Sequence, residues 1–203
     1  NRLAYGRLGA KEFFVSGGRD GALRVWRRGQ TSAIQTLQGH ELAVNGVAVC
    51  PEAPERACSG SRDWSVRVWD LDAGKETAFV KLEWNVVSFM RWIPGEESVL
   101  QASEDLQLRV WDVRSMTRPA ETIAAAHNNI MTCCDVTSDG QRFLTCSNGF
   151  DSAGCELKVW DRRKGALVCD LGGHVQSVTC CAFLPPSLSQ GSDQLGVCAL
   201  ACL

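Results

Sequence analysis

Long apolar runs are missing from this sequence, and neither sign of charge is in excess. No uninterrupted apolar segment approaches the roughly 18 residues that a membrane-spanning helix requires, so insertion into a membrane is not expected. The 21 basic and 23 acidic side chains leave a net charge of −2. Such a balance supplies no long-range field that would attract nucleic acid or an anionic membrane, so neither is an expected partner.

Groups that could carry catalysis are scarce. Only three histidines are present, at His40, His127 and His174, and the carboxylates do not suggest a convergent pair. The Ser-Gly-Gly stretch at 16–18 and the Ser-Gly-Ser stretch at 59–61 lead into predicted strands, whereas a phosphate-binding loop leads into a helix. We therefore expect no catalytic residue, no cofactor and no small-molecule substrate, and the protein is not predicted to be an enzyme.

The eleven cysteines lack the spacing of a metal site. Zinc sites typically combine one Cys-x2-Cys pair with a second pair, and no such arrangement occurs here. Cys133-Cys134 and Cys180-Cys181 follow a histidine in the register that Gly46-Val47 has in another segment. Cysteine thus replaces small apolar core residues, which indicates a reducing compartment. We expect a cytoplasmic protein without a bound metal.

One motif recurs along the chain and defines its organisation. The copy at residues 58–70 reads Cys-Ser-Gly-Ser-Arg-Asp-Trp-Ser-Val-Arg-Val-Trp-Asp, and related copies end at Trp26, Trp111 and Trp160. The closing tryptophans recur roughly every 40 to 50 residues, which is the period of a four-stranded propeller blade.

These copies resemble the repeats of WD-repeat β-propellers. The resemblance implies an all-β fold of four-stranded antiparallel blades, each tied together by a hydrogen-bonded chain of histidine, hydroxyl, turn aspartate and tryptophan. The residues assigned to these networks are Asp20, Trp26, His40, Asp63, Trp69, Asp105, Trp111, His127, Trp160 and His174. Their expected role is structural, because buried polar groups require hydrogen-bonding partners.

The chain is predicted to be a single propeller region, residues 1–203. The expected units are a partial blade 1–38, blades 39–81, 82–125 and 126–172, and a partial blade 173–203. Closed propellers have about four to eight blades, and most WD-repeat examples have seven. The four to five blades expected here therefore predict an incomplete, open propeller.

Two of the blades depart from the pattern. The third has no histidine at its entrance, near Leu82-Glu83, so a weaker internal network is expected there. The turn of the fourth is enlarged at residues 148–155, and Asn148 and Asp151 are both candidates for its turn acid.

Several segments resemble one cilium-associated subgroup of WD-repeat proteins. They are Asn85-Val86-Val87, Trp92-Ile93-Pro94 and the loop Cys146-Ser147-Asn148-Gly149-Phe150. This resemblance implies a cilium-related assembly as the place of action.

A propeller by itself implies no chemistry, so function must come from its surface. In WD-repeat proteins the entrance loops and the aspartate-bearing turns emerge at one end, which would place Trp64, Trp84 and Phe150 there together with Arg19 and Arg62. Exposed aromatic side chains can anchor a partner, and arginines can contact its carboxylates. We therefore predict a scaffold for other proteins. The alternative is that Trp64 and Trp84 pack against neighbouring loops.

A second hypothesis comes from Trp111-Asp112-Val113-Arg114. This segment resembles the adaptor-docking box of substrate receptors of cullin-type ubiquitin ligases, which implies docking through Trp111, Asp112 and Arg114. Gln101 departs from that box, where a small residue is expected.

Overall fold

The computed structural model describes residues 3–9, 11–184 and 197–201. Every regular element of these residues is a β-strand. Over the same ranges, no helix is long and apolar enough to cross a membrane.

Four antiparallel sheets have four strands each, and each sheet follows the order of the chain. The first two contain β1 (Leu3–Leu8), β2 (Lys11–Gly17), β3 (Leu23–Arg27), β4 (Gln35–Leu37), and β5 (Val44–Val49), β6 (Arg56–Ser61), β7 (Ser65–Asp70), β8 (Lys75–Lys81). The next two contain β9 (Val87–Trp92), β10 (Ser98–Ser103), β11 (Leu108–Asp112), β12 (Glu121–Ile123), and β13 (Met131–Val136), β14 (Arg142–Ser147), β15 (Leu157–Asp161), β16 (Ala166–Leu171). A fifth sheet pairs β17 (Val178–Phe183) with β18 (Val197–Ala201).

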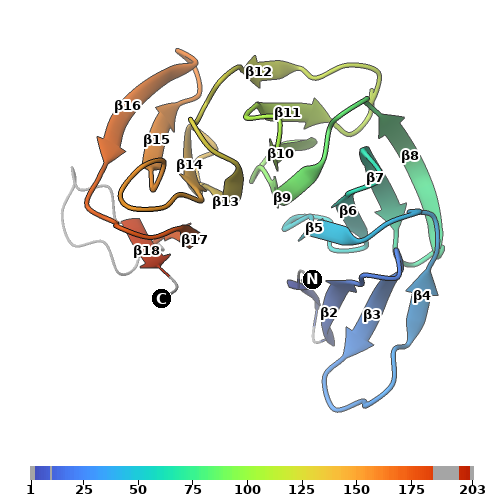
Figure 1. The fold of residues 1–203 in the computed structure, drawn as a ribbon. Helices are drawn as coiled ribbons and strands as arrows, with labels where there is room; N and C mark the ends of the chain where they lie inside the picture. Colours follow the sequence, from blue (N-terminus) through green and yellow to red (C-terminus); the bar gives the residue numbers. More distant parts are fainter. Residues whose placement is uncertain (1–2, 10, 185–196, 202–203) are drawn as a thin grey trace.

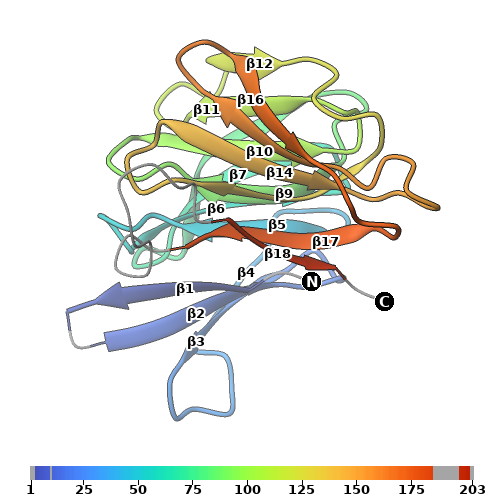
Figure 2. The ribbon, with the colours of Figure 1, turned by 90° about the vertical axis from the view of Figure 1, so that its left-hand side faces the viewer.

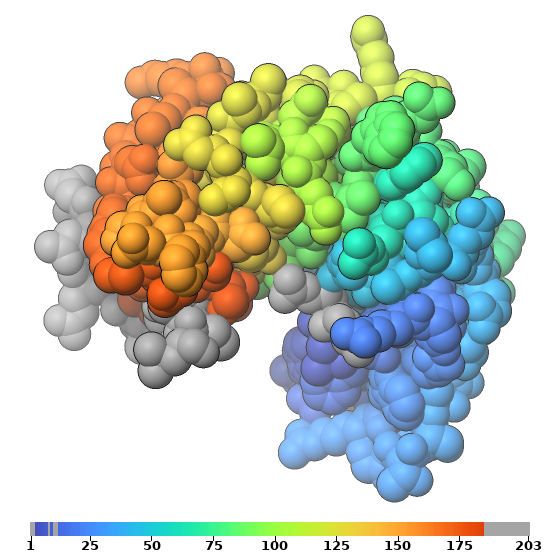
Figure 3. Space-filling model, in the orientation of Figure 1, coloured from blue at the N-terminus to red at the C-terminus, as the bar shows by residue number. Residues whose placement is uncertain are grey.

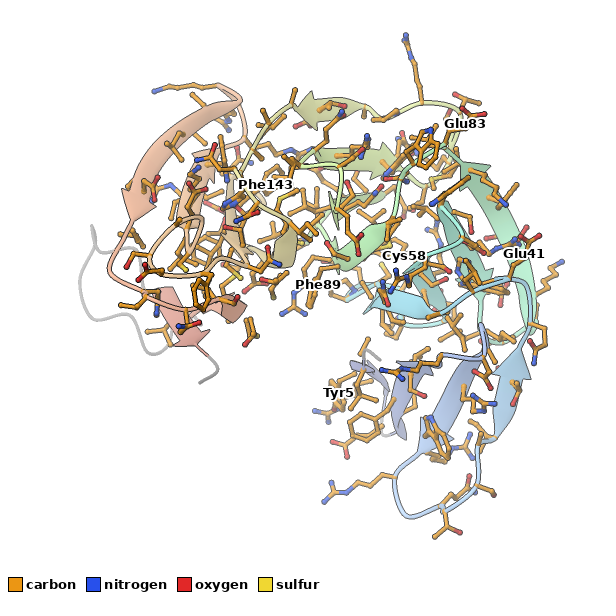
Figure 4. The ribbon with its side chains drawn as sticks, viewed as in Figure 1. Tyr5, Glu41, Cys58, Glu83, Phe89 and Phe143 are labelled. Carbon is orange, nitrogen blue, oxygen red and sulfur yellow. The ribbon has the colours of Figure 1, made fainter. Side chains whose placement is uncertain are left out.

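The sheets are the blades of an incomplete β-propeller. Figure 1 shows them as an open arc whose innermost strands are β1, β5, β9, β13 and β17, and Figure 2 shows the blades stacked side by side. The arc is open between the first blade and the fifth sheet. Tyr5, which is 52% exposed, lies on the side of the first blade that faces this opening (Figure 4).

The first blade is complete, which corrects the prediction of a partial blade at residues 1–38. Its inner strand β1 pairs with β2 in a register that places Ala4 opposite Val15 and Tyr5 opposite Phe14. The repeat pattern rests on the Trp-Asp ends of the third strands, and residues 3–8 carry no such motif, so the pattern missed this strand.

The hydrophobic core lies between the blades, and the closing tryptophans hold equivalent places in it. Trp69 packs against the first blade, Trp111 against the second and Trp160 against the third. All four closing tryptophans lie on the third strand of their blade, opposite the second strand. Trp26 is only half-buried, as expected for a first blade with no described blade before it.

An arginine clamp also joins the third and fourth blades. The guanidinium of Arg162 contacts Glu96 (2.7 Å) and Glu121 (2.8 Å), and it lies 5.8 Å from the ring centre of Phe143. Burial opposes its charge, but the bonds to both carboxylates raise the pKa of Arg162.

Candidate functional site

The second blade contains the full hydrogen-bonded chain that the sequence predicts. The Nε1 of Trp69 donates to Ser59 Oγ (2.8 Å), which lies 2.7 Å from Nε2 of His40. The other ring nitrogen of His40 lies 3.1 Å from the Asp63 carboxylate. Burial alone would raise the pKa of Asp63, but hydrogen bonds from His40, Ser65 and the Glu41 backbone lower it well below its ordinary value.

The third blade, in which a weaker network was predicted, has a network of different composition. The Nε1 of Trp111 donates to Gln101 Oε1 (2.6 Å), and Gln101 Nε2 donates to Asn85 Oδ1 (2.5 Å). The guanidinium of Arg109, only 7% exposed, donates to Asn85 (3.1 Å) and Asp105 (2.5 Å). An amide and a buried guanidinium therefore replace the histidine and the hydroxyl.

The fourth blade uses Glu156 as its acid, so neither Asn148 nor Asp151 has the predicted role. His127 joins Thr145 Oγ1 (2.6 Å) to Glu156 Oε2 (3.0 Å), and Trp160 donates to the same Thr145 hydroxyl (2.8 Å). Burial, together with the nearby Lys158 charge, lowers the pKa of His127 to about 4. His127 is therefore neutral at pH 7.

The first and fifth units contain only parts of the network. Trp26 donates to Ser16 Oγ (2.8 Å), and Asp20 pairs with Arg24 (2.5 Å) near the surface. His174 is half-buried and makes no hydrogen bond within the residues that the structure describes, so its predicted network role is not realised there.

A cation two residues before each closing tryptophan is the signal that the sequence reading missed. Arg24, Arg109 and Lys158 all pair with an acid at the turn side of their blade. In the second blade the turn acid, Asp63, is hydrogen-bonded to His40. Arg67 reaches instead to Glu76 on the outer strand and lies 4.5 Å from the ring centre of Phe79.

Two tryptophans meet at the end of the blades that carries the β6–β7 turn and the β8–β9 loop, here called the turn face. The ring centres of Trp64 and Trp84 are 5.3 Å apart, with the planes inclined by 38°. Trp64 is half-buried by this contact, whereas Trp84 is 74% exposed. The packing alternative therefore applies to Trp64, while the indole of Trp84 faces solvent.

The backbone at both tryptophans is left-handed, with φ of 70° at Trp64 and 60° at Trp84. Trp64 follows the turn aspartate, and the residues at the same place in neighbouring blades, Gly21 and Leu106, have φ of 79° and 65°. The turn itself therefore requires this conformation. Glycine adopts it freely, whereas a bulky residue there is a conformational outlier.

The remaining predicted surface residues are exposed, and Arg62 shares the β6–β7 turn with Trp64. Phe150, 74% exposed, lies in the β14–β15 loop two blades away. That loop (orange) and the β8–β9 loop (green) occupy separate parts of the turn face in Figure 3. Arg19 and Arg62 are exposed and form no ion pair with any described residue.

The segment that resembles a ligase-docking box is divided between core and surface. Trp111 is fully buried, whereas Arg114 is 70% exposed in an ion pair with Asp112 (2.8 Å). The bonds from Arg114 lower the pKa of Asp112 to about 2.

Across residues 3–9, 11–184 and 197–201, no group of three or more His, Cys, Asp or Glu side chains could hold a metal ion.

Two segments of the chain match a known repeat, and each contains the outer strand of one blade and three strands of the next. Residues 31–70 and 120–161, which both end on a Trp-Asp pair, match the WD40 model described as "WD domain, G-beta repeat". These two segments are similar to WD40 repeats. The matched segments include the His40 and His127 networks described above, so the WD40 resemblance and the hydrogen-bond geometry agree.

The curated relatives of this chain are distant. It is 27% identical to Periodic tryptophan protein 2 of Arabidopsis thaliana over 81% of this chain and 18% of that protein. It is 26% identical to the Ribosome biogenesis protein WDR12 homolog of Oryza sativa subsp. japonica, over 85% of this chain and 46% of that protein. It is 25% identical to Nuclear distribution protein nudF of Emericella nidulans, over 60% of this chain and 32% of that protein. The chain thus spans less than half the length of each of these relatives.

Proposed function

We propose that this WD40 chain is a non-catalytic scaffold that binds other proteins through its turn face. The observation that carries the proposal is the Trp64–Trp84 pair, because it presents a large indole to solvent on a support that is already packed. Aromatic side chains of this kind supply much of the energy of protein interfaces, and they lose few rotamers on binding.

The left-handed backbone at Trp64 belongs to the turn and does not by itself indicate function, because Leu106 adopts it in the third blade. A non-glycine residue in that conformation costs on the order of 1–2 kcal/mol, and glycine fills the equivalent position in the first blade. What distinguishes Trp64 from these residues is its ring contact with Trp84.

Alanine substitution on the turn face provides the test. Trp84→Ala should reduce the amount of captured protein partners in affinity purification with quantitative mass spectrometry, while the far-UV circular dichroism stays unchanged. Phe150→Ala and Arg62→Ala extend the map across the face. Ile34→Ala is the matched control, because Ile34 is an exposed apolar residue in the β3–β4 connection. An identical partner set for Trp84→Ala and the wild-type protein would refute the proposal.

The finer setting that we propose is a cytoplasmic, cilium-related assembly. It is supported by the resemblance of the Cys146–Phe150 loop and the neighbouring segments to WD repeat-containing protein 31, which is associated with cilia. The abundance of cysteine thiols supports a reducing compartment. Proximity labelling in ciliated cells tests this setting, and labelled proteins without ciliary components would contradict it.

A second candidate function is substrate receptor of a cullin-type ubiquitin ligase, and the exposure of Arg114 favours it. An adaptor could reach this guanidinium in place of Asp112. Capture of the adaptor should be lost in Arg114→Ala and kept in Arg118→Ala, which alters an arginine four residues away. If the wild-type protein never captures the adaptor, this function is excluded.

A further inference from the structure

Four cysteines meet where the fourth blade faces the β17–β18 sheet. Cys133 lies on β13, Cys146 lies opposite it on β14, and Cys180 and Cys181 lie on β17. The Sγ atoms of Cys133 and Cys180 are 3.9 Å apart, although the two residues belong to different sheets. The Cys133 thiol also lies 3.6 Å from the backbone oxygen of Cys181.

Two hydrogen bonds between the sheets hold this sulfur pair in place. On one side the Thr132 hydroxyl bonds to the Val178 carbonyl. On the other side the Phe183 amide donates to Asp135 Oδ2 (2.8 Å). Because Cys133 and Cys180 lie between these two bonds in sequence, the alignment of β13 and β17 fixes the distance between them.

Access to solvent differs among the thiols. Cys133 and Cys181 are buried, whereas Cys180 is half-buried. Contact with Cys146 raises the pKa of Cys133, while hydrogen bonds from Cys133 and Cys181 lower the pKa of Cys146. A dissolved oxidant would therefore reach this cluster first at Cys180.

We propose that Cys133 and Cys180 form an oxidation site at which a peroxide joins the fourth blade covalently to the β17–β18 sheet. The Cys180 thiolate attacks one oxygen of hydrogen peroxide, and hydroxide leaves, which gives a sulfenic acid. The sulfur of Cys133 then attacks the sulfur of Cys180, and the displaced hydroxyl leaves as water with the Cys133 proton. Overall, two thiols are oxidised to one disulfide and one peroxide is reduced to two water molecules.

The geometry allows this bond without a change of fold. A disulfide needs the sulfurs at about 2.05 Å, so they must approach each other by roughly 2 Å, which rotation of the side chains can supply. The product would restrain the fifth sheet, whose strand β17 packs against the fourth blade.

Peptide mapping provides the test. The whole chain is treated with hydrogen peroxide, its remaining thiols are alkylated, and it is digested without reductant. Tandem mass spectrometry should then find a peptide pair that joins Cys133 to Cys180 and that disappears on treatment with dithiothreitol. The oxidised protein should also melt at a higher temperature than the reduced protein.

Cys180→Ser should abolish the joined pair, and Cys169→Ser should keep it. Cys169 is the matched control because it is also half-buried but lies on the outer strand β16. If a variant fails to fold, the peptide map of the oxidised wild-type protein alone shows whether Cys133 and Cys180 are joined. A disulfide that joins Cys180 to another cysteine, or conversion of Cys180 to a sulfinic acid without cross-linking, would overturn the proposal.

Discussion

The indole Nε1 of Trp111 donates to the amide oxygen of Gln101, whereas the closing tryptophans of the other three complete blades donate to a serine or threonine hydroxyl. The longer amide then bonds Asn85, so the chain of polar contacts extends without a histidine. The same fold therefore tolerates two chemically different internal supports.

Removal of this amide should be costly. Gln101→Ala leaves the buried Trp111 N–H without an acceptor and removes one of the two donors to Asn85 Oδ1, and we expect a loss of about 1–3 kcal/mol in the free energy of unfolding. Gln101→Ser should lose less, because a hydroxyl at this position accepts from tryptophan in the second blade. Urea denaturation measures both values. Gln30→Ala, on an exposed loop, is the control, and an equal loss there would show that the network contributes nothing.

Stability should fall as the pH is lowered from about 6.5 to about 4. His127 has a pKa of about 4 in the folded protein, below its ordinary value of 6.5. Between these values the unfolded chain binds a proton that the folded chain does not, so acid favours unfolding. At about 1.36 kcal/mol per pKa unit the effect is at most about 3 kcal/mol.

Thermal melts across this pH range would check the His127 effect. His127→Gln should flatten the pH dependence, while His174→Gln should leave it as in the wild-type protein, because His174 is half-buried and outside any described network. A slope that persists in His127→Gln would assign it to another group.

The Trp64 turn allows stability and binding to be separated. Trp64→Gly relieves the left-handed strain but loses the ring contact with Trp84, which is worth about 0.5–1.5 kcal/mol. The two effects oppose each other, so the free energy of unfolding should change by less than about 1 kcal/mol. Partner capture should nevertheless weaken. Leu106→Gly, at the equivalent turn of the next blade, should leave partner capture unchanged. If both variants lose partner capture equally, the altered turn conformation is the cause and the Trp64 side chain is not.

Close packing between the second and third blades depends on Gly60. A Cβ at this position would lie 2.7 Å from Val87 Cβ and 2.9 Å from Met90 Sδ. Gly60→Ala should therefore destabilise the protein by about 1–3 kcal/mol. Gly172→Ala, where a Cβ meets nothing within 4 Å, is the control for the change of glycine to alanine. Equal melting temperatures would mean that the interface adjusts without cost.

Apart from the inner strand of the first blade, the sequence was sufficient for the architecture and for the network of the second blade. The recurring Trp-Asp ends locate the third strands, and the resemblance to WD repeats implies the network of His40, Asp63 and Trp69. The network residues of the third and fourth blades could not be foreseen from the second blade. Contacts there depend on the length and direction of the side chains of Gln101, Arg109 and Glu156. The stacking of Trp64 on Trp84 depends on how adjacent blades are aligned, which a single repeat does not encode.

Arg67 shows how a residue near the inside of a blade determines what its outer rim presents. With His40 bound to Asp63, the guanidinium extends along the strand to Glu76 and covers Phe79. In the neighbouring blade, which has no entrance histidine, the equivalent Arg109 is withdrawn into the interior. One position of the repeat thus supports the outer strand in one blade and the internal network in the next, and its side chain is largely buried in both, at 15% and 8% exposure.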